Sequence, residues 1–245
     1  MSGEVLELWR RGPRPWVWAH RGASAHATEN TQAAFALAHE HGADGIELDV
    51  RCCATGEVVV FHDAALTRLA DRPESIATTP WPVLRTVVLG GDHGIPLLAD
   101  VLAATTLPIN VELKSSWPGA VGALPAAVVA VLAAQPGAAT RVVISSFDPA
   151  ALVAVHALAP HLPLGVLFER EVAVAPTVAG ARSLHPPHVR CTAEAVARWR
   201  AAGLAVHTWT VDDPARLRAL AAAGVDGVFA NDPRAAIAAF RGLTA

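Results

Sequence analysis

Two acidic side chains, Glu47 and Asp49, lie close together in the stretch 45–50, which reads Gly-Ile-Glu-Leu-Asp-Val. Apolar and acidic residues alternate there, and a period of two residues predicts a β-strand with one apolar and one acidic face. The two carboxylates then project from the same face, roughly 6–7 Å apart along the strand. In a single Glu-x-Asp strand, the simplest interpretation is that this face meets water.

A second stretch repeats the arrangement and changes that interpretation. Residues 109–114 alternate apolar side chains with Asn110, Glu112 and Lys114, and Lys114 is the only lysine in the chain. Two strands with apolar outsides and ionic insides indicate a closed barrel that carries charge at one end of its interior. Three carboxylates gathered there repel one another unless a cation lies between them. We therefore predict that Glu47, Asp49 and Glu112 bind a hard divalent metal ion.

The composition narrows the class of protein. The chain has 245 residues, of which 53% are apolar and 17% charged, as expected for an α/β protein with buried parallel strands. A formal net charge of −3, without a long basic stripe, argues against nucleic acid as the main partner. The sequence shows no signal-peptide core and no stretch of about 18 uncharged apolar residues, so we expect no membrane span. Three cysteines, two of them adjacent, favour free thiols in the cytoplasm.

The order of the predicted elements defines the fold class. Strands are predicted at 16–19, 44–50, 109–114, 141–145, 164–168, 204–211 and 227–230, with a weaker unit at 172–184 and a hairpin partner at 57–61. Helices are predicted at 32–41, 98–105, 121–135, 149–159, 192–202, 214–223 and 233–240. This pattern predicts an α/β protein with one (β/α)8 TIM-type barrel over residues 16–241, after an N-terminal lead of residues 1–15. The irregular stretch 64–94 is predicted to form an excursion over one barrel end.

Side chains at the carboxyl ends of barrel strands line the active sites of such proteins. The residues at those positions are His20, Arg21, Glu47, Asp49, His62, Glu112, Lys114, Ser145, Ser146, His185, Trp209 and Asn231. Histidine can move a proton near neutral pH. Arg21 and Lys114 suit a phosphate, and carboxylates with a hard metal ion suit phosphate oxygens. The inventory therefore favours chemistry on a phosphate ester.

Several of these residues also have plainer interpretations. Lys114 could be an interior ion-pair partner of Glu112, and His62 could cap a turn with Asp63. Trp209 could fill the core as well as form a pocket wall. Ser145 and Ser146 lack the Gly-x-Ser-x-Gly surroundings of a strained nucleophile. Four further histidines are expected on helix surfaces: His39, His41, His156 and His161.

A series of motifs spans the chain from residue 20 to residue 233. The motifs are His20-Arg21-Gly22, Glu29-Asn30-Thr31, Glu47-Leu48-Asp49-Val50, Val59-Val60-Phe61-His62-Asp63, Ile95-Pro96-Leu97-Leu98, Val111-Glu112-Leu113-Lys114, Ser145-Ser146-Phe147, Thr208-Trp209-Thr210-Val211 and Asn231-Asp232-Pro233. In kind and order they resemble those of the glycerophosphodiester phosphodiesterases. The set covers almost the whole chain, and its order makes the resemblance specific.

The resemblance implies an enzyme that hydrolyses small glycerophosphodiesters to sn-glycerol 3-phosphate and an alcohol. By the same resemblance, Glu47, Asp49 and Glu112 bind Mg²⁺ or Ca²⁺, and His20 and His62 form the acid/base pair. Arg21 and Lys114 would hold the phosphate, and we expect Trp209 and His185 in the pocket wall.

Two other functions are compatible with the sequence. One is a lysophospholipase D-like phosphodiesterase acting on a lipid, for which only residues 81–84 suggest an apolar lip. The other is a non-catalytic binder of phosphate metabolites, which the loss of a metal ligand or histidine would favour, although none is lost. The sequence leaves open the alcohol, the metal, the attacking hydroxyl, the division of acid and base between the histidines, and the oligomeric state.

Overall fold

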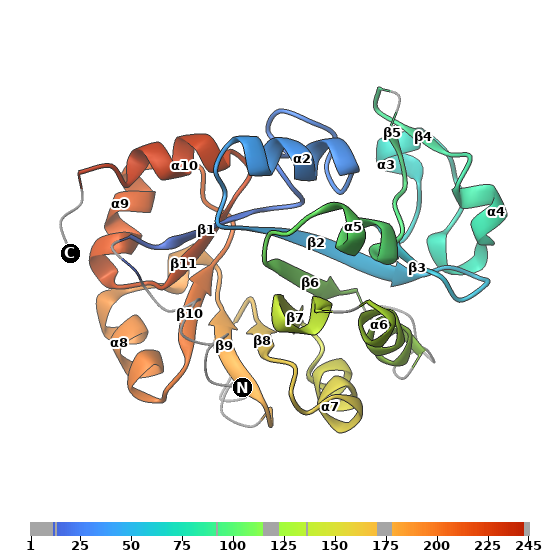
Figure 1. Cartoon of the computed structure of the whole chain (residues 1–245). Helices are drawn as coiled ribbons and strands as arrows, with labels where there is room; N and C mark the ends of the chain where they lie inside the picture. The colour runs from blue at the N-terminus through green and yellow to red at the C-terminus, as the bar shows by residue number, and fades with distance from the viewer. Residues whose placement is uncertain are drawn as a thin grey trace.

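The structure is a computed structural model, and it describes residues 12, 14–91, 93–114, 123–135, 137–170 and 178–242. Eight parallel strands form its centre (Figure 1). They are β1 (Trp16–Ala19), β2 (Gly45–Cys52), β6 (Ile109–Leu113), β7 (Val142–Ser146), β8 (Leu164–Leu167), β9 (Ala181–His185), β10 (Ala205–Thr208) and β11 (Gly227–Ala230). The first strand, β1, pairs with both β2 and β11, so the sheet closes into the predicted (β/α)8 barrel.

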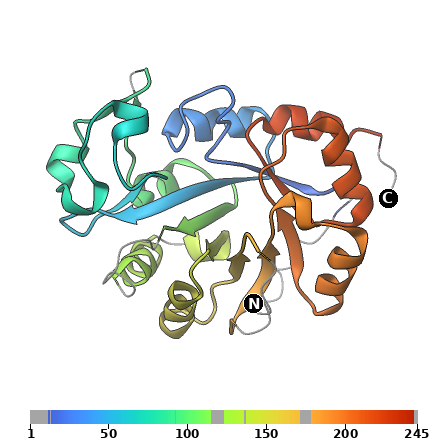
Figure 2. The ribbon, with the colours of Figure 1, turned by 180° about the vertical axis from the view of Figure 1, so that it is seen from behind.

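Helices surround the barrel on its outer face (Figures 1 and 2). They are α2 (Gln32–Glu40), α5 (Leu98–Ala104), α6 (Ala123–Ala134), α7 (Pro149–Leu158), α8 (Ala193–Ala201), α9 (Pro214–Ala223) and α10 (Pro233–Ala239). Oxygen-bearing side chains fix the starts of several helices, because they accept hydrogen bonds from first-turn amides that lack a partner within the helix. Thr31 caps α2 in this way, and Asp232 caps α10. The predicted helix start at 121–122 and the segment 172–177 lie outside the described residues.

The irregular stretch 64–94 forms a small lobe beside the barrel. It contains α3 (Thr67–Ala70), a 3₁₀ turn (Ile76–Thr78), α4 (Trp81–Leu84), β4 (Val88–Leu89) and β5 (His93–Gly94). The lobe packs next to the end of β2, where β3 (Val58–Val60) pairs antiparallel with it (Figures 1 and 2). Leu66, Ile76 and Leu84 are fully buried in a small core that the lobe shares with Val59 and Phe61. Short elements with a local core explain why no long periodicity marks this part of the sequence.

Aromatic side chains fill the barrel interior. The rings of Trp18 and Phe229 stack with centroids 6.1 Å apart, and Trp18 Nε1 donates a hydrogen bond to His207 Nδ1 at 2.8 Å. Gly45 makes room for this layer, because a Cβ atom there would lie 2.4 Å from the Trp18 ring. The barrel is therefore packed below its carboxyl end, which leaves that end as the place for a site.

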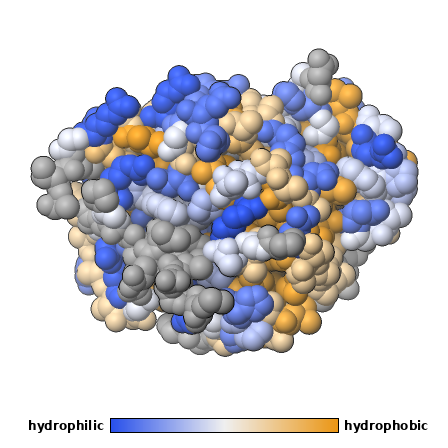
Figure 3. Space-filling model, in the orientation of Figure 1, coloured by the Kyte–Doolittle hydropathy of each residue, from blue (hydrophilic) through white to orange (hydrophobic). Residues whose placement is uncertain are grey.

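The outer surface is apolar over part of the helical layer. Figure 3 shows hydrophobic residues gathered where Figure 1 places α6 and α7. On α7, the side chains of Val153 and Leu158 are each more than half exposed. Within the described residues, no helix combines the length and apolar character that crossing a membrane requires.

Candidate active site

The barrel strands bring most of the predicted site residues to one cavity, and Asp49 lies directly beside its lining. The register of β2 and β6 places Asp49 opposite Glu112 and Glu47 opposite Asn110. The cavity has a volume of about 250 Å³. It is lined by His20, Arg21, Glu47, His62, Asn110, Glu112, Lys114, Phe147, Leu167, Glu169, Trp209, Thr210 and Phe229.

Three carboxylates form the acidic centre of this cavity. Glu47, Asp49 and Glu112 are all buried, and each contributes one oxygen to a group whose members lie within 4.8 Å of one another. Glu47 Oε1 is buried without a hydrogen-bond partner among the described residues. Convergent carboxylate oxygens with an unsatisfied acceptor are the donor set that Mg²⁺ or Ca²⁺ prefers. The residues present therefore fit the predicted hard divalent ion.

Burial and charge interactions give the three carboxylates different pKa values. Burial raises the pKa of Glu47 well above its usual range, and the charges of Asp49 and Glu112 add to the effect. Burial and Asp49 likewise raise the pKa of Glu112 to about 7. Burial also opposes ionisation of Asp49, but Lys114 and Arg21 outweigh it and lower the pKa of Asp49 to about 2. Without a metal ion, the site therefore holds one firmly ionised carboxylate and two carboxyl groups that retain protons more readily.

The two predicted phosphate-binding cations contact the carboxylates directly. Lys114 Nζ lies 3.0 Å from Asp49 Oδ1 and also pairs with Glu112, so the ion-pair interpretation of Lys114 describes its contacts in this structure. Arg21 Nε lies 3.3 Å from Asp49 Oδ2. Both cations also line the cavity, where they can meet an anionic ligand.

The backbone turn after β1 aims Arg21 at this site. Arg21 adopts a left-handed conformation with φ of 57°, and its amide N–H donates to Glu47 Oε2 at 2.9 Å. Such backbone is costly outside glycine and asparagine and is found mainly at functional sites. Gly22 follows with φ of 83°, and a Cβ atom there would lie 2.6 Å from the Ala34 backbone. The His20-Arg21-Gly22 motif is thus a tight turn closed against α2.

A fixed hydrogen-bond chain sets the tautomer of His20. Its Nδ1 lies 2.8 Å from Asn231 Oδ1, which also accepts from Ser24 Oγ. Asn231 Nδ2 donates to Asp212 Oδ2 at 2.6 Å, so the amide oxygen must face His20. His20 Nδ1 therefore carries the proton, and Nε2 is left with its lone pair. Burial lowers the pKa of His20, and Arg21 adds to this effect.

His62 has a carboxylate partner instead. Its Nδ1 lies 2.6 Å from Asp63 Oδ1, and Arg68 Nε donates to Asp63 Oδ2 at 2.6 Å. Arg68 also pairs with Glu29, which in turn accepts a hydrogen bond from Arg21. Burial lowers the pKa of His62, although the charge of Asp49 and the hydrogen bond to Asp63 oppose that effect. The turn-cap interpretation of His62 is incomplete, because this side chain also lines the cavity.

The remaining wall of the cavity is aromatic. Phe147 and Trp209 meet edge to face with centroids 5.6 Å apart, and Glu169 stands exposed at the rim. His185 is buried outside the cavity lining, and its carbonyl oxygen accepts a hydrogen bond from Trp209 Nε1 at 2.7 Å. Trp209 is thus in the wall, and His185 supports it from behind.

Some residues of the site were not identified from the sequence. Asp212 lies in a loop and Arg68 in the short helix α3, and their roles depend on contacts with residues distant in sequence, Asn231 for Asp212 and Glu29 for Arg68. Two serines of the inventory are structural. Ser145 Oγ accepts from Asn110 Nδ2, and Ser146 Oγ donates to the Leu113 carbonyl. Their hydroxyl groups thus serve buried polar neighbours.

A (β/α)8 barrel with acids, two histidines and two cations around one cavity is a site of the kind that acts on phosphate esters. The model of the glycerophosphoryl diester phosphodiesterase family matches residues 20–235, so the chain belongs to this family. The sequence-based expectations of the family and of an enzyme of this class are confirmed.

Individual relatives agree over nearly the full chain. A glycerophosphodiester phosphodiesterase of Caldanaerobacter subterraneus is 33% identical over 238 residues, which cover 90% of this chain and 96% of the relative. A solved phosphodiesterase of Oleispira antarctica, in complex with its product sn-glycerol-3-phosphate, has a TM-score of 0.88 at 29% identity, covering 93% of this chain and 97% of that one. A glycerophosphodiester phosphodiesterase structure from Thermotoga maritima has a TM-score of 0.79 at 27% identity, covering 93% and 99%.

Proposed function

We propose that the protein hydrolyses glycerophosphodiesters to sn-glycerol 3-phosphate and an alcohol, with the help of a divalent metal ion. The observation that carries this proposal is the convergence of Glu47, Asp49 and Glu112, of which Glu47 and Glu112 line the cavity together with His20 and His62. The product complex of the Oleispira antarctica relative supports the substrate class.

The three carboxylates are the residues that would hold the ion. A bound Mg²⁺ or Ca²⁺ would supply positive charge to the phosphate oxygens as charge builds up during the reaction. Arg21 and Lys114 are placed to bind the phosphate from the same cavity. Lys114 would then share its ammonium group between the phosphate and the carboxylates that it contacts here.

The two histidines differ in the partner of Nδ1, and this difference suggests their roles. His20 donates to the neutral Asn231 amide, so its Nε2 lone pair can take a proton from the attacking hydroxyl. His62 is paired with the Asp63 carboxylate, which stabilises the imidazolium form that donates a proton. We therefore assign His20 as the general base and His62 as the general acid for the leaving alkoxide.

Among the described residues, the apolar candidate lip does not belong to the cavity. Residues 81–84 form α4 in the side lobe, and none of them lines the cavity. The free thiols of Cys52, Cys53 and Cys191 support the cytoplasm as the location, because that compartment keeps cysteines reduced.

Turnover on a substrate panel tests this function. Glycerophosphocholine, glycerophosphoethanolamine, glycerophosphoglycerol and a lysophospholipid would be incubated with the protein in excess Mg²⁺, and sn-glycerol 3-phosphate measured. We expect release from the small diesters and loss of the activity after chelation, with recovery when Mg²⁺ returns. Full turnover by protein verified as metal-free would contradict the metal requirement. Turnover of the lysophospholipid alone would contradict the proposed substrate class and favour the lipid substrate instead.

A further inference from the structure

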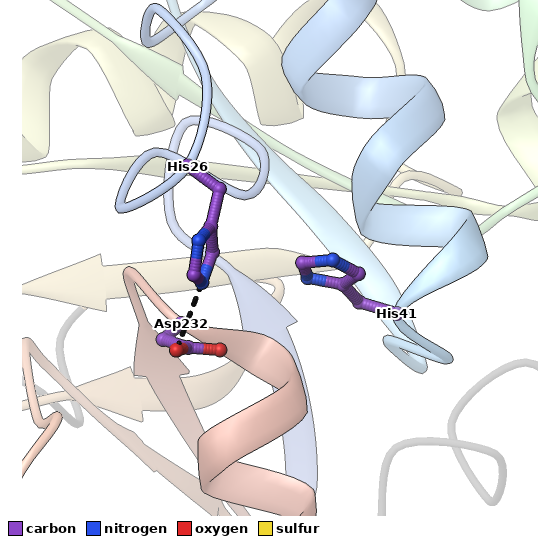
Figure 4. A group of neighbouring side chains, drawn as sticks. All are labelled: His26, His41 and Asp232. Atoms are coloured by element: carbon purple, nitrogen blue, oxygen red, sulfur yellow. Dashed lines mark hydrogen bonds and ion pairs between the residues drawn. The ribbon is translucent and has the colours of Figure 1, made fainter.

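A second cluster of metal-binding residue types lies away from the cavity. His26, His41 and Asp232 each present one ligand atom, and these atoms lie within 4.8 Å of one another. Figure 4 shows the His26 ring pointing down to the Asp232 carboxylate and the His41 ring pointing towards both from the side. The two imidazole rings meet edge to face, with centroids 5.2 Å apart.

The three residues come from three different segments. His26 lies in the loop between β1 and α2, and His41 is the residue that ends α2. Asp232 precedes α10 and uses Oδ1 to accept from the Ala235 amide at 2.9 Å. Its other oxygen, Oδ2, lies 2.9 Å from His26 Nε2. One carboxylate oxygen thus caps a helix, while the other faces the histidine pair.

His41 carries the observation that a plain hydrogen-bonded cluster leaves unexplained. The sequence predicts it on a helix surface, and that prediction is wrong, because His41 is only 8% exposed. Its Nδ1 atom is buried and has no hydrogen-bond partner among the described residues. A buried polar atom without a hydrogen-bond partner destabilises the folded state. An unpaired buried nitrogen at a helix end where most neighbours are exposed needs an explanation, and a bound ion that the nitrogen coordinates would provide one.

We propose that His26, His41 and Asp232 form a second metal site, selective for zinc or a similar late transition-metal dication. Two imidazole nitrogens and one carboxylate oxygen are ligands that Zn²⁺ takes in proteins, with a fourth position open to water. Mg²⁺ and Ca²⁺ prefer oxygen ligands. The histidine-containing cluster would therefore bind the transition-metal ion, and the carboxylate cluster of the cavity would bind Mg²⁺ or Ca²⁺.

Zinc binding would require the ligand atoms of the three residues to move slightly closer together. Ligand atoms of a tetrahedral zinc site lie about 3.4 Å apart, given metal–ligand bonds of about 2.0–2.2 Å. His26 is nearly half exposed in a loop, so its ring can move by the roughly 1 Å that this needs. The Zn²⁺ ion would replace the proton between His26 and Asp232, and that proton would leave to solvent.

The position of the cluster suggests what the ion would do. The loop that contains His26 also contains Arg21 and Ser24. Arg21 contacts Asp49 of the carboxylate cluster, and Ser24 donates a hydrogen bond to Asn231. Asp232 directly follows Asn231, the partner of His20. A bound ion would therefore fasten this loop to the start of α10 and stabilise the folded chain without taking part in the reaction.

Zinc stoichiometry in excess Mg²⁺ tests the proposal directly. Equilibrium dialysis against Zn²⁺ would compare the wild-type chain with His26→Gln and Asp232→Asn. Asn also caps helices well, so the second variant keeps α10 capped. His39→Gln is the matched control, because His39 is an exposed histidine of the same helix outside the cluster. We expect wild type and His39→Gln to bind one equivalent of Zn²⁺ more than the other two variants.

Thermal unfolding gives a readout that does not depend on activity. At a Zn²⁺ concentration of about 100 Kd, the melting temperature of wild type and His39→Gln should rise by roughly 5–10 °C. His26→Gln, whose side chain lies in a loop and is 44% exposed, should lose this rise. Equal stoichiometry and equal shifts in wild type and His26→Gln would overturn the proposal. Because it concerns a site outside the cavity, this outcome would leave the catalytic assignment unaffected.

Discussion

Lys114 Nζ lies 3.0 Å from Asp49 Oδ1, so the only lysine of the chain stands inside the carboxylate cluster. It also donates to Glu112, and its side chain is only 15% exposed. Burial disfavours its charge, but Asp49 and Glu112 outweigh that effect and raise the pKa of Lys114. The ammonium group therefore stays charged and partly neutralises the acids.

Replacing Lys114 by Met removes this charge but keeps most of the side-chain volume. We expect kcat/KM on glycerophosphocholine to fall by roughly 100- to 1,000-fold, as for other groups that stabilise charge in a transition state. Steady-state kinetics would measure it. Arg218→Met, on the exposed face of α9, removes a surface cation and should keep the wild-type rate. A similar rate in both variants would show that Lys114 serves only as an ion-pair partner of the carboxylates and not in the reaction.

Metal removal should make stability depend on pH in a definite direction. In the metal-free protein, the pKa of Glu112 is about 7, against an ordinary value of 4.5, so the folded state binds a proton that the unfolded chain releases. Unfolding free energy should therefore be greatest below about pH 4.5 for this group and decline as pH rises to about 7. The decline should be on the order of 3 kcal/mol. Glu47 shifts in the same direction and adds to it.

Urea unfolding between pH 4.5 and 8, with chelator or with saturating Mg²⁺, would measure this decline. Mg²⁺ should abolish it, because the ion favours the ionised carboxylates. Asp49, with a pKa of about 2, acts in the opposite sense, but only below about pH 4. An identical slope with and without Mg²⁺ would contradict the assignment of the ion to these carboxylates.

Strand periodicity carried most of what the sequence could predict. The alternation around Glu47, Asp49 and Glu112 fixed both the strands and the face that meets the cavity, because side chains of a strand point alternately to its two sides. The domain limits at residues 1–15 and 16–241 stay a prediction. The partners of the histidines could not be derived in this way. Asp63 and Glu29 lie in loops and Arg68 in the one-turn helix α3, and no periodicity specifies how these short segments meet.

The burial of His41 likewise could not be predicted from the periodicity of a single element. Its position at the end of an amphipathic helix predicted exposure, since α2 buries Phe35 and Ala38 on its core face. The contact that covers His41 comes from His26 in the preceding loop, folded back beside α10. Helix periodicity describes only the face of one element, whereas burial at a helix end depends on the path of the neighbouring chain.

Replacing Asp63 by Asn tests the support of His62. The charge and hydrogen bond of Asp63 favour the imidazolium form, so their loss should lower the pKa of His62. The proposed acid must be protonated, and the basic limb of the pH–rate profile should therefore move to lower pH. The rate at neutral pH should fall by roughly 10- to 100-fold, as for other partners that orient a functional group. Asp71→Asn, an exposed acid of the same lobe, should leave the profile unchanged.

The division of labour between the two histidines gives the most specific prediction. His20→Ala and His62→Ala should each lose roughly 100- to 10,000-fold in rate on glycerophosphocholine, because general acid and general base catalysis are each worth about that much. The leaving alkoxide of this substrate is a poor one and needs a proton. A nitrophenyl phosphodiester of glycerol releases a phenolate that needs none. Its hydrolysis therefore still requires the base but not the acid.

On the nitrophenyl ester, His62→Ala should recover most of the wild-type rate, whereas His20→Ala should stay inactive. The reason lies in the partners: the Asn231 amide fixes the proton of His20 on Nδ1, while Asp63 favours the charged form of His62. His161→Ala, at an exposed position outside the cavity, is the control for losing a histidine. Recovery of His20→Ala instead would reverse the two roles. Equal losses by both variants on both substrates would refute the acid/base division altogether, and the carboxylate site would still stand on its own test by chelation.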